Sequence, residues 1–181
     1  SLFYENYSKK ILSDSFSFFS TNKVIIKPAI SANADDTFII NTENSEKISI
    51  MLENTFTNRK FIIQPFIENI VLEGEYSLIF FENTHSHTLV KKPKSGDFRV
   101  QEEHGGILTP IEKPDIKMVH EAKKVLNSLP CKSLYSRIDF VKRENNFLLM
   151  EVELIEPSLY FNLNPSAAQK FASIINKKFQ K

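Results

Sequence analysis

Two segments of alternating polar and apolar residues, 134–141 and 147–154, constrain the fold of this chain more than any other feature. Alternation with a period of two over this length is the pattern of a β-strand with two different faces. The polar run 143–146 between the segments predicts a tight turn, so the pair is expected to form an antiparallel hairpin. In the second strand the alternation predicts one face with Phe147, Leu149, Glu151 and Glu153, and an opposite face with Met150, Val152 and Leu154.

The hairpin gathers charged side chains on one of its faces. Arg137 and Asp139 share a face of the first strand, and the turn would set Asp139 opposite Glu151, with Glu153 as the next neighbour on that face. Clustered carboxylates repel one another, and a hard divalent cation such as Mg²⁺ beside substrate phosphates removes that repulsion. A solvated strand face with alternating charges explains the same pattern, so the residues alone leave both interpretations open.

The rest of the sequence predicts short strands interspersed with amphipathic helices. An α+β fold with largely antiparallel strands is therefore expected. The segment 7–19 has weak helical spacing and gives no firm prediction. Strands are expected at 23–27, 37–40, 60–64, 75–81, 87–92 and 98–101, and helices at 45–55, from Pro114 to Leu129 and from Asn164 onward.

The composition argues against several classes of partner. Lys and Arg number 23 against 22 Asp and Glu, so no overall field attracts nucleic acid or an anionic membrane. Cys131 is the single cysteine, which excludes an intrachain disulfide and fits a reducing compartment. The sequence shows neither a signal peptide nor an apolar run long enough to cross a bilayer. We expect a cytoplasmic protein without a nucleic-acid or membrane partner.

Two motifs in the first half suit parts of a nucleotide. Lys27 ends a buried strand and is followed by a small-residue turn that begins at Ser31, a combination that can hold a phosphate with an ammonium group and backbone N–H groups. Taken alone, these residues are better explained as a strand-terminal lysine before a proline turn. The run Gln64-Pro-Phe66 ends another strand and would expose backbone groups beside apolar side chains, as an adenine edge requires. An ordinary strand connection is the alternative.

A third motif, KKPKSGDFRVQEEHGG, concentrates positive charge between glycines. Lys91, Lys92, Lys94 and Arg99 lie in this stretch, and three of the four glycines of the chain fall between Gly96 and Gly106. The pattern predicts a local anion site on a loop that orders with substrate. A solvated hairpin is the alternative.

These segments, in this order, resemble the ATP-grasp superfamily, and most of all the prokaryotic glutathione-synthetase-like ligases and the ring-forming ligase of cycloserine biosynthesis. D-alanine–D-alanine ligases are more distant. The resemblance runs from about Lys23 to Phe171. It implies an ATP-grasp fold with mostly antiparallel sheets in two lobes and the nucleotide site between them. The implied bounds are 23–68 for the small lobe and 69–181 for the large lobe, with 1–22 as the remnant of a longer chain.

The resemblance also implies roles for individual residues. Lys27 matches a lysine on the α- and β-phosphates, and Ser31 lies in the position of the phosphate-covering loop. Arg99 matches an arginine that meets the acyl substrate or the transferred phosphate, and Arg137 one that stabilises the oxyanion. The remaining matches are an adenine-binding hinge at Gln64, Phe66 and Ile67, acids around adenine and ribose at Glu68 and Glu75, and magnesium ligands at Asp139, Glu151 and Glu153.

The implied reaction joins a small-molecule carboxylate to an amine or similar nucleophile through an acyl-phosphate, with ATP and two Mg²⁺ ions, or Mn²⁺ in their place. Three features depart from the pattern. Glu153 stands where many relatives have Asn, the turn after Ser31 lacks glycines, and only 26 residues precede Lys27. Relatives carry an N-terminal substrate domain and a further ATP-contacting lysine there. We therefore expect a truncated ATP-binding portion of a ligase, or alternatively a non-catalytic nucleotide-binding module or regulatory remnant.

Overall fold

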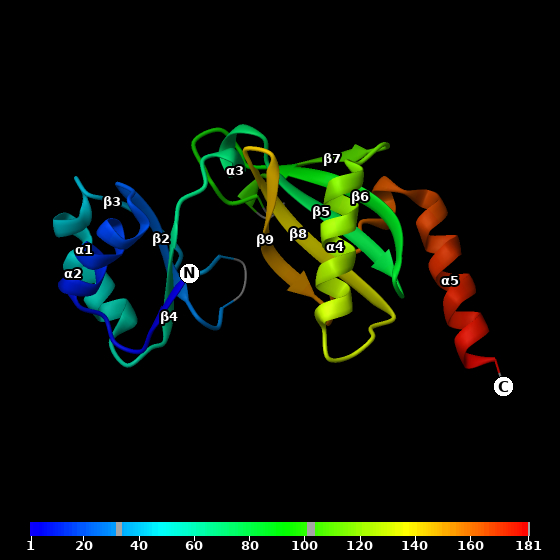
Figure 1. Cartoon of the computed structure of the whole chain (residues 1–181), viewed down its shortest axis with the longest axis horizontal. Helices are drawn as coiled ribbons and strands as arrows, with labels where there is room; N and C mark the ends of the chain where they lie inside the picture. Colours follow the sequence, from blue (N-terminus) through cyan, green and yellow to red (C-terminus); the bar gives the residue numbers. More distant parts are fainter. Residues whose placement is uncertain (32–33, 101–103, 181) are drawn as a thin grey trace. The chain divides into compact units, whose positions relative to one another are not determined.

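The computed structural model describes residues 1–31, 34–100 and 104–180 of the chain. They form two compact units, Ser1–Ile67 and Glu68–Lys181. Each unit has its own antiparallel sheet with helices packed against it (Figure 1). The expected α+β fold with antiparallel sheets is confirmed. No helix among the described residues is long and apolar enough to span a membrane.

The first unit has a four-stranded sheet in the order β1-β4-β2-β3. The strands are β1 (Leu2–Tyr4), β2 (Lys23–Pro28), β3 (Phe38–Asn41) and β4 (Phe61–Pro65), and the helices are α1 (Lys9–Phe19) and α2 (Ser45–Phe56). Alternation in β2 buries Val24 and Ile26, which join Leu12 of α1 and Leu52 of α2 in one core. Both helices therefore cover the same face of this sheet, and the side chains at 23, 25 and 27 lie on the other face.

The helix α1 had no firm prediction from sequence, and its ends explain how it forms. Ser8 is the N-cap, and its hydroxyl accepts a hydrogen bond from the backbone N–H of Ile11 at 3.3 Å. Ser20 ends the helix in the left-handed conformation. Leu12 and Ser15 are buried, and Ile11, Phe16 and Phe19 pack partly buried against the same core. The serine within this buried face weakens the apolar periodicity of the segment.

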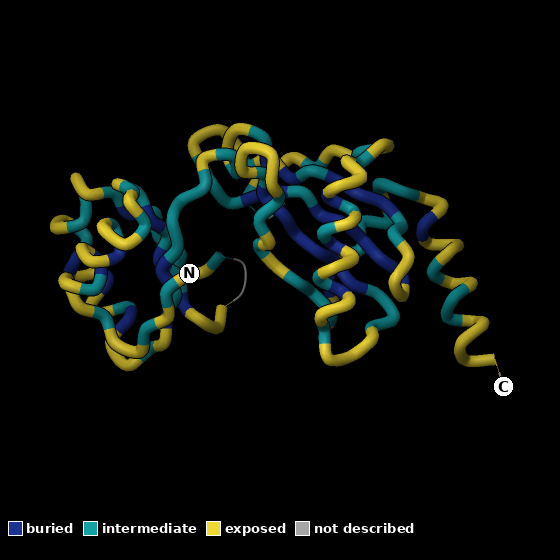
Figure 2. Tube along the Cα trace, viewed as in Figure 1, coloured by how far each residue is buried: buried dark blue, intermediate teal, exposed yellow. Residues whose placement is uncertain are grey.

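The second unit has a five-stranded antiparallel sheet in the order β7-β6-β5-β8-β9. Figure 2 shows the buried strands of this sheet as its darkest part. The strands are β5 (Glu75–Phe81), β6 (Thr84–Lys92), β7 (Ile107–Ile111), β8 (Tyr135–Arg143) and β9 (Asn146–Glu153). The helical segments are α3 (Asn69–Leu72), α4 (Ile116–Ser128), the 3₁₀ turn η2 (Phe161–Leu163) and α5 (Pro165–Phe179).

The two faces of this sheet have different surroundings. Leu78 and Phe80 of β5 pack with Met118 and Ala122 of α4, which lies across the sheet in Figure 1. The opposite face is apolar only towards the end where β5 finishes. There Ile79, Phe81 and Leu89 pack with Ala167 of α5 and with the residues around η2. The remainder of that second face carries charged side chains.

The expected strands and helices mostly form, and the short elements β1, α3 and η2 are additions to them. No strand covers the described residues 98–100, where the carboxylate of Asp97 accepts hydrogen bonds from the backbone N–H groups of Phe98 (2.7 Å) and Arg99 (3.0 Å). A side chain that captures backbone donors in this way competes with strand pairing. Gln101 lies outside the described residues. The strand β7 was not predicted; it contains Pro110 and is an edge strand, where proline is tolerated.

Candidate functional site

Six charged side chains from four neighbouring strands share the second face of the five-stranded sheet. Strand pairing sets Glu75 opposite Lys91, Asp139 opposite Glu151, and Arg137 opposite Glu153. Opposite residues of an antiparallel pair point to the same side of the sheet. We call this set the charged cluster: Glu75 of β5, Lys91 of β6, Arg137 and Asp139 of β8, and Glu151 and Glu153 of β9.

A β-bulge decides which side chains of β9 join the cluster. Asp139 pairs with Glu151, but Phe140 pairs with Leu149, so Met150 is the extra residue. As a result Phe147 packs against Phe140 on the α4 face, with ring centroids 6.3 Å apart. The prediction that Phe147 and Leu149 share a face with Glu151 and Glu153 is therefore wrong. The predicted alignment of Asp139 with Glu151 is confirmed.

Asp139 is the centre of the cluster and has no exposed surface. Its Oδ2 atom lies 3.0 Å from Lys91 Nζ and 2.9 Å from Arg137 Nη2, and Arg137 Nε lies 3.0 Å from both carboxylate oxygens. Burial alone would raise the pKa of Asp139, but Lys91 and Arg137 hold it below its ordinary value. Asp139 is therefore an ionised oxygen donor inside the protein.

Lys91 is a buried member of the cluster that its sequence context does not reveal. It is 4% exposed, and its Nζ also lies 2.5 Å from Glu75 Oε1. Burial lowers the pKa of Lys91, but Glu75 and Asp139 raise it more, so the ammonium group stays charged. Two carboxylates balance this charge, so Lys91 adds no uncompensated positive charge to the stretch expected to form an anion site.

The carboxylates of β9 are more accessible. The Glu151 side chain is 56% exposed and that of Glu153 is 26% exposed. Arg137 Nη2 donates to Glu153 and lies 3.7 Å from Glu151 Oε2. Burial, together with the negative charges of Glu153 and Asp139, raises the pKa of Glu151. Four carboxylates face two cationic side chains in this cluster, so it carries excess negative charge when all are ionised.

The three carboxylates of the hairpin are arranged like cation ligands. One oxygen from each of Asp139, Glu151 and Glu153 lies within 4.8 Å of the others. Hard divalent cations such as Mg²⁺ and Ca²⁺ bind carboxylate oxygens, and a cation would relieve the repulsion that raises the pKa of Glu151. The donor set therefore fits a divalent cation.

The uncovered face of the first unit carries Lys27 and Gln64. Pairing of β2 with β4 sets Lys27 opposite Ile62 and Ile25 opposite Gln64, so all four share this face. Gln64 Nε2 donates to Ser1 Oγ at 2.6 Å. Lys27 is half-buried, and no salt bridge to it occurs within the described part of the chain. This face thus presents an ammonium group beside apolar side chains.

The predicted hinge begins with Gln64 in β4 and continues with Phe66 and Ile67 beyond it. The backbone N–H of Phe66 donates to the carbonyl oxygen of Lys23 at 3.1 Å, and Lys23 Nζ lies 4.0 Å from the centre of the Phe66 ring. Ile67 is the last residue of the first unit. Ser31 is exposed, and the next two residues of the predicted phosphate loop, Ala32 and Asn33, lie outside the described residues.

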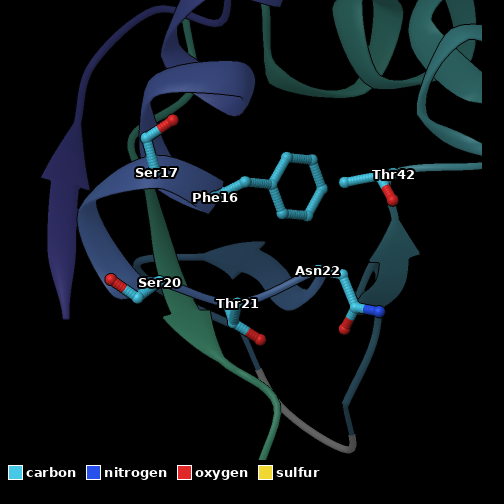
Figure 3. A pocket seen from close by; sticks show the side chains of 6 residues that line it. All are labelled: Phe16, Ser17, Ser20, Thr21, Asn22 and Thr42. Carbon is cyan, nitrogen blue, oxygen red and sulfur yellow. The ribbon is translucent and has the colours of Figure 1, made fainter.

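A shallow hollow of about 580 Å³ in the first unit involves none of the predicted residues (Figure 3). It lies where α1 ends and where β2 and β3 have their neighbouring ends. Its Phe16 packs against the helix-covered core, not on the face with Lys27. The lining residues are Phe16, Ser17, Ser20, Thr21, Asn22 and Thr42.

The sequence of this chain was compared with models of known protein families. A family model described as the ATP-grasp domain matches residues 6–153, most of the chain. The chain belongs to the ATP-grasp family. The suspected resemblance is thereby confirmed, and the match spans both units.

Solved ATP-grasp structures share this fold at low sequence identity. D-cycloserine synthetase DcsG superposes with a TM-score of 0.81 at 20% identity, over 98% of this chain and 63% of that chain. The D-alanine–D-alanine ligase of Bacillus anthracis in complex with ATP superposes with a TM-score of 0.65 at 17% identity, over 97% of this chain and 56% of that chain. The ATP-grasp ligase PsnB in complex with its minimal precursor superposes with a TM-score of 0.65 at 12% identity, over 98% of this chain and 54% of that chain. A search of curated protein sequences finds none that matches this chain. This ATP-grasp chain therefore spans between about half and two thirds of the length of these relatives.

Two further predicted residues of this ATP-grasp chain, Arg99 and Glu68, belong to the second unit. Arg99 forms a fork with Asp97, with Nη2 2.7 Å from Oδ2, and this arginine lowers the pKa of Asp97. Glu68 lies at the N-terminus of α3, where its carbonyl oxygen accepts from the backbone N–H of Val71 at 2.9 Å. The predicted substrate loop around Arg99 includes residues 101–103, which lie outside the described residues.

Proposed function

We propose that this chain is the ATP- and Mg²⁺-binding portion of an ATP-grasp carboxylate ligase. The observation that carries the proposal is the trio Asp139, Glu151 and Glu153, whose oxygens lie within 4.8 Å of one another in a chain of this family. In the proposed reaction a substrate carboxylate oxygen attacks the γ-phosphorus of ATP, which gives an acyl-phosphate and ADP. An amine then attacks the acyl carbon, phosphate leaves, and an amide forms.

The proposal gives the charged cluster two tasks. Asp139, Glu151 and Glu153 would hold two Mg²⁺ ions, or Mn²⁺ in their place, which neutralise the phosphate oxygens of the nucleotide. Arg137 would stabilise the negative charge that develops on the transferred group. In the structure Arg137 is hydrogen-bonded to Asp139 and Glu153. Cation binding to these carboxylates would free its donors for the substrate.

The remaining proposed contacts follow the family pattern. In the first unit we assign Lys27 to the phosphates, Ser31 to the phosphate loop, and Gln64, Phe66 and Ile67 to adenine. In the second unit we assign Glu68 to the nucleotide and Arg99 to the acyl substrate, which requires its fork with Asp97 to open. Glu75 is buried against Lys91, which supports a role in holding Lys91 more than direct contact with ribose.

A second candidate function is a non-catalytic nucleotide-binding module. The observation in its favour is that both proposed catalytic arginines pair with carboxylates of this chain: Arg137 with Asp139 and Glu153, and Arg99 with Asp97. Phosphate release with amino acid and peptide substrates distinguishes the two functions. We expect release only from a chain that also binds the carboxylate substrate, because orientation of the reactants is a large part of such catalysis.

Calorimetric titration with ATP, with and without Mg²⁺, tests the proposal. We expect Mg²⁺-dependent binding that Glu151→Gln weakens at least about tenfold, the loss typical of altered metal-site partners. Folding stability should hardly change, because the Glu151 side chain is largely exposed. Glu144→Gln, at the exposed tip of the same hairpin, is the matched control and should bind like the original protein.

The same titration tests the nucleotide contact of the first unit. Lys27→Met should weaken ATP binding roughly 10- to 150-fold, the equivalent of one ammonium–phosphate hydrogen bond of about 1.5–3 kcal/mol. Lys60→Met removes an exposed lysine of the same unit, paired with Glu5, and should leave the affinity unchanged. The proposed function would be refuted if the ATP affinity does not depend on Mg²⁺ and is unchanged in both Glu151→Gln and Lys27→Met.

A further inference from the structure

Tyr160 has an unusual backbone conformation beside the charged cluster. Its φ of 50° and ψ of 43° place it in the left-handed region, which bulky side chains avoid. Tyr160 is the one aromatic residue with positive φ among the described residues. Strained backbone of this kind persists only where the surrounding structure imposes it, and it is concentrated at functional sites. The question is what holds Tyr160 in this conformation.

Contacts on both sides of Tyr160 fix its position. Before it, the carbonyl oxygen of Leu159 accepts a hydrogen bond from His87 Nε2 of β6 at 3.0 Å. The other ring nitrogen of His87 lies 2.9 Å from the hydroxyl of Ser86, which holds the imidazole in place. After it, Phe161 packs against the rings of Phe81 and Phe171, with centroid distances of 6.2 and 6.0 Å. The backbone between these anchors has little freedom.

The anchored ring faces the charged cluster. The guanidinium carbon of Arg137 lies 6.0 Å from the centre of the Tyr160 ring, within the range of a cation–π contact. Tyr160 therefore lies beside one of the two cationic side chains of the charged cluster.

The contact gives Arg137 a partner that is not a carboxylate. Within the described part of the chain, the ion pairs of Arg137 are with Asp139, Glu151 and Glu153, the three proposed cation ligands. When a cation occupies those oxygens, the ring remains as a neighbour that can still hold the guanidinium group. A neutral ring can do this without competing for the cation.

We propose that Tyr160 is a positioning residue that holds the Arg137 guanidinium group through its aromatic ring. The left-handed backbone of Tyr160, fixed by His87 on one side and by Phe161 on the other, is what brings the ring to this place. The importance of Arg137 for ligation rests on the proposed function. The positioning of Arg137 does not, because it is measurable in the protein without nucleotide.

Hydrogen exchange at the Arg137 side chain tests the inference directly. The chain has four arginines, so its Nε–Hε signals are few, and Arg137→Lys identifies the relevant one. We expect Tyr160→Leu and Tyr160→Gly to speed exchange of the Arg137 Hε by roughly 2- to 5-fold, the equivalent of one weak cation–π contact at the 6.0 Å separation seen here. Tyr160→Phe keeps the ring and should exchange like the original protein. An unchanged rate in Tyr160→Leu, or a Phe variant as fast as the Leu variant, would overturn the proposal.

Two controls separate positioning from folding and from the proposed function. Tyr160→Gly removes the backbone strain as well as the ring, and Glu156→Gly removes left-handed strain nearby in the same segment. Exchange at Arg137 should rise in the first variant only; a rise in both would show that the segment, not the ring, holds Arg137. Mg-ATP affinity should fall roughly 2- to 5-fold in Tyr160→Leu and stay unchanged in Tyr160→Phe. If the original protein does not bind Mg-ATP, the proposed function fails, and the exchange rates still decide the role of Tyr160.

Discussion

The charge balance around Asp139 is the strongest constraint on any single residue of this chain. Its carboxylate has no exposed surface and contacts both Lys91 and Arg137, which are themselves almost fully buried. Removing one member of a buried ion pair leaves the other charge without compensation, and this costs more than the pair itself contributes. Asp139 therefore matters for folding as well as for the proposed cation site.

We expect Asp139→Asn to lower the free energy of unfolding by about 3–5 kcal/mol at pH 7, measured by urea denaturation. Asp97→Asn is the matched control, because Asp97 also pairs with an arginine two residues away but at the surface, and its loss should be small. The cations lower the pKa of Asp139, so its contribution is present above the unfolded value of about 3.9 and is lost as the pH falls through the lower folded value. Equal losses in the two variants would contradict this account.

The sequence predicted some members of the charged cluster and not others. Asp139, Glu151 and Glu153 follow from alternation, because their strands are adjacent in sequence. Lys91 belongs to a different strand, and a sequence alone does not reveal that β6 and β8 lie on either side of β5. For that reason Lys91 was interpreted as part of a positively charged loop, although it is a buried partner of Asp139.

At the scale of strands and helices, alternation and capping predicted most elements but not the irregularity in β9. Perfect alternation places Phe147 and Glu151 on one face, and only the extra residue Met150 separates them. A bulge carries no clear signal here, since β9 contains neither glycine nor proline. The start of β5 is different, because there a glycine marks a close approach.

Gly74 precedes β5 with a φ of 103°, and a Cβ atom added to it would lie 2.6 Å from the carbonyl oxygen of Lys91. Gly74→Ala should therefore destabilise the second unit by more than the roughly 1 kcal/mol that left-handed backbone costs an alanine. Gly96→Ala is the matched control, because Gly96 has a φ of 85° and a Cβ atom added there would meet no atom of the described residues within 4 Å. Urea denaturation measures both variants. Equal destabilisation would show that the contact with Lys91 is relieved by a small backbone shift.

At the scale of the whole molecule, the apolar cores follow the division into two units. The core around Leu52 contains only residues between Leu12 and Ile63, together with partly buried neighbours from the same unit. The cores around Leu78 and Ile79 contain only residues of Glu68–Lys181. Most of the apolar burial that stabilises each unit therefore comes from its own residues.

We expect each unit to open separately in native-state hydrogen exchange. Leu52→Ala should reduce protection of β2 and β4 by about 2–5 kcal/mol and leave β5 and β8 unchanged. Leu78→Ala, at an equally buried position of the other unit, should have the reverse effect. Loss of protection in both units from either substitution would show that the chain unfolds as one cooperative structure.

The five-stranded sheet also restricts how the length of this chain can vary. One backbone layer separates an apolar side, packed on α4, from an ionic side that holds Asp139 and its partners. Without a compensating bulge, a single deletion within β8 would reverse the orientation of the side chains that follow it in this strand. Carboxylates would then enter the apolar side and phenylalanines the ionic side. Extra residues at the hairpin tip around Glu144 leave this arrangement intact. Insertions at the hairpin tip are therefore expected to be tolerated better than insertions or deletions within its strands, unless a bulge like the one at Met150 absorbs the change.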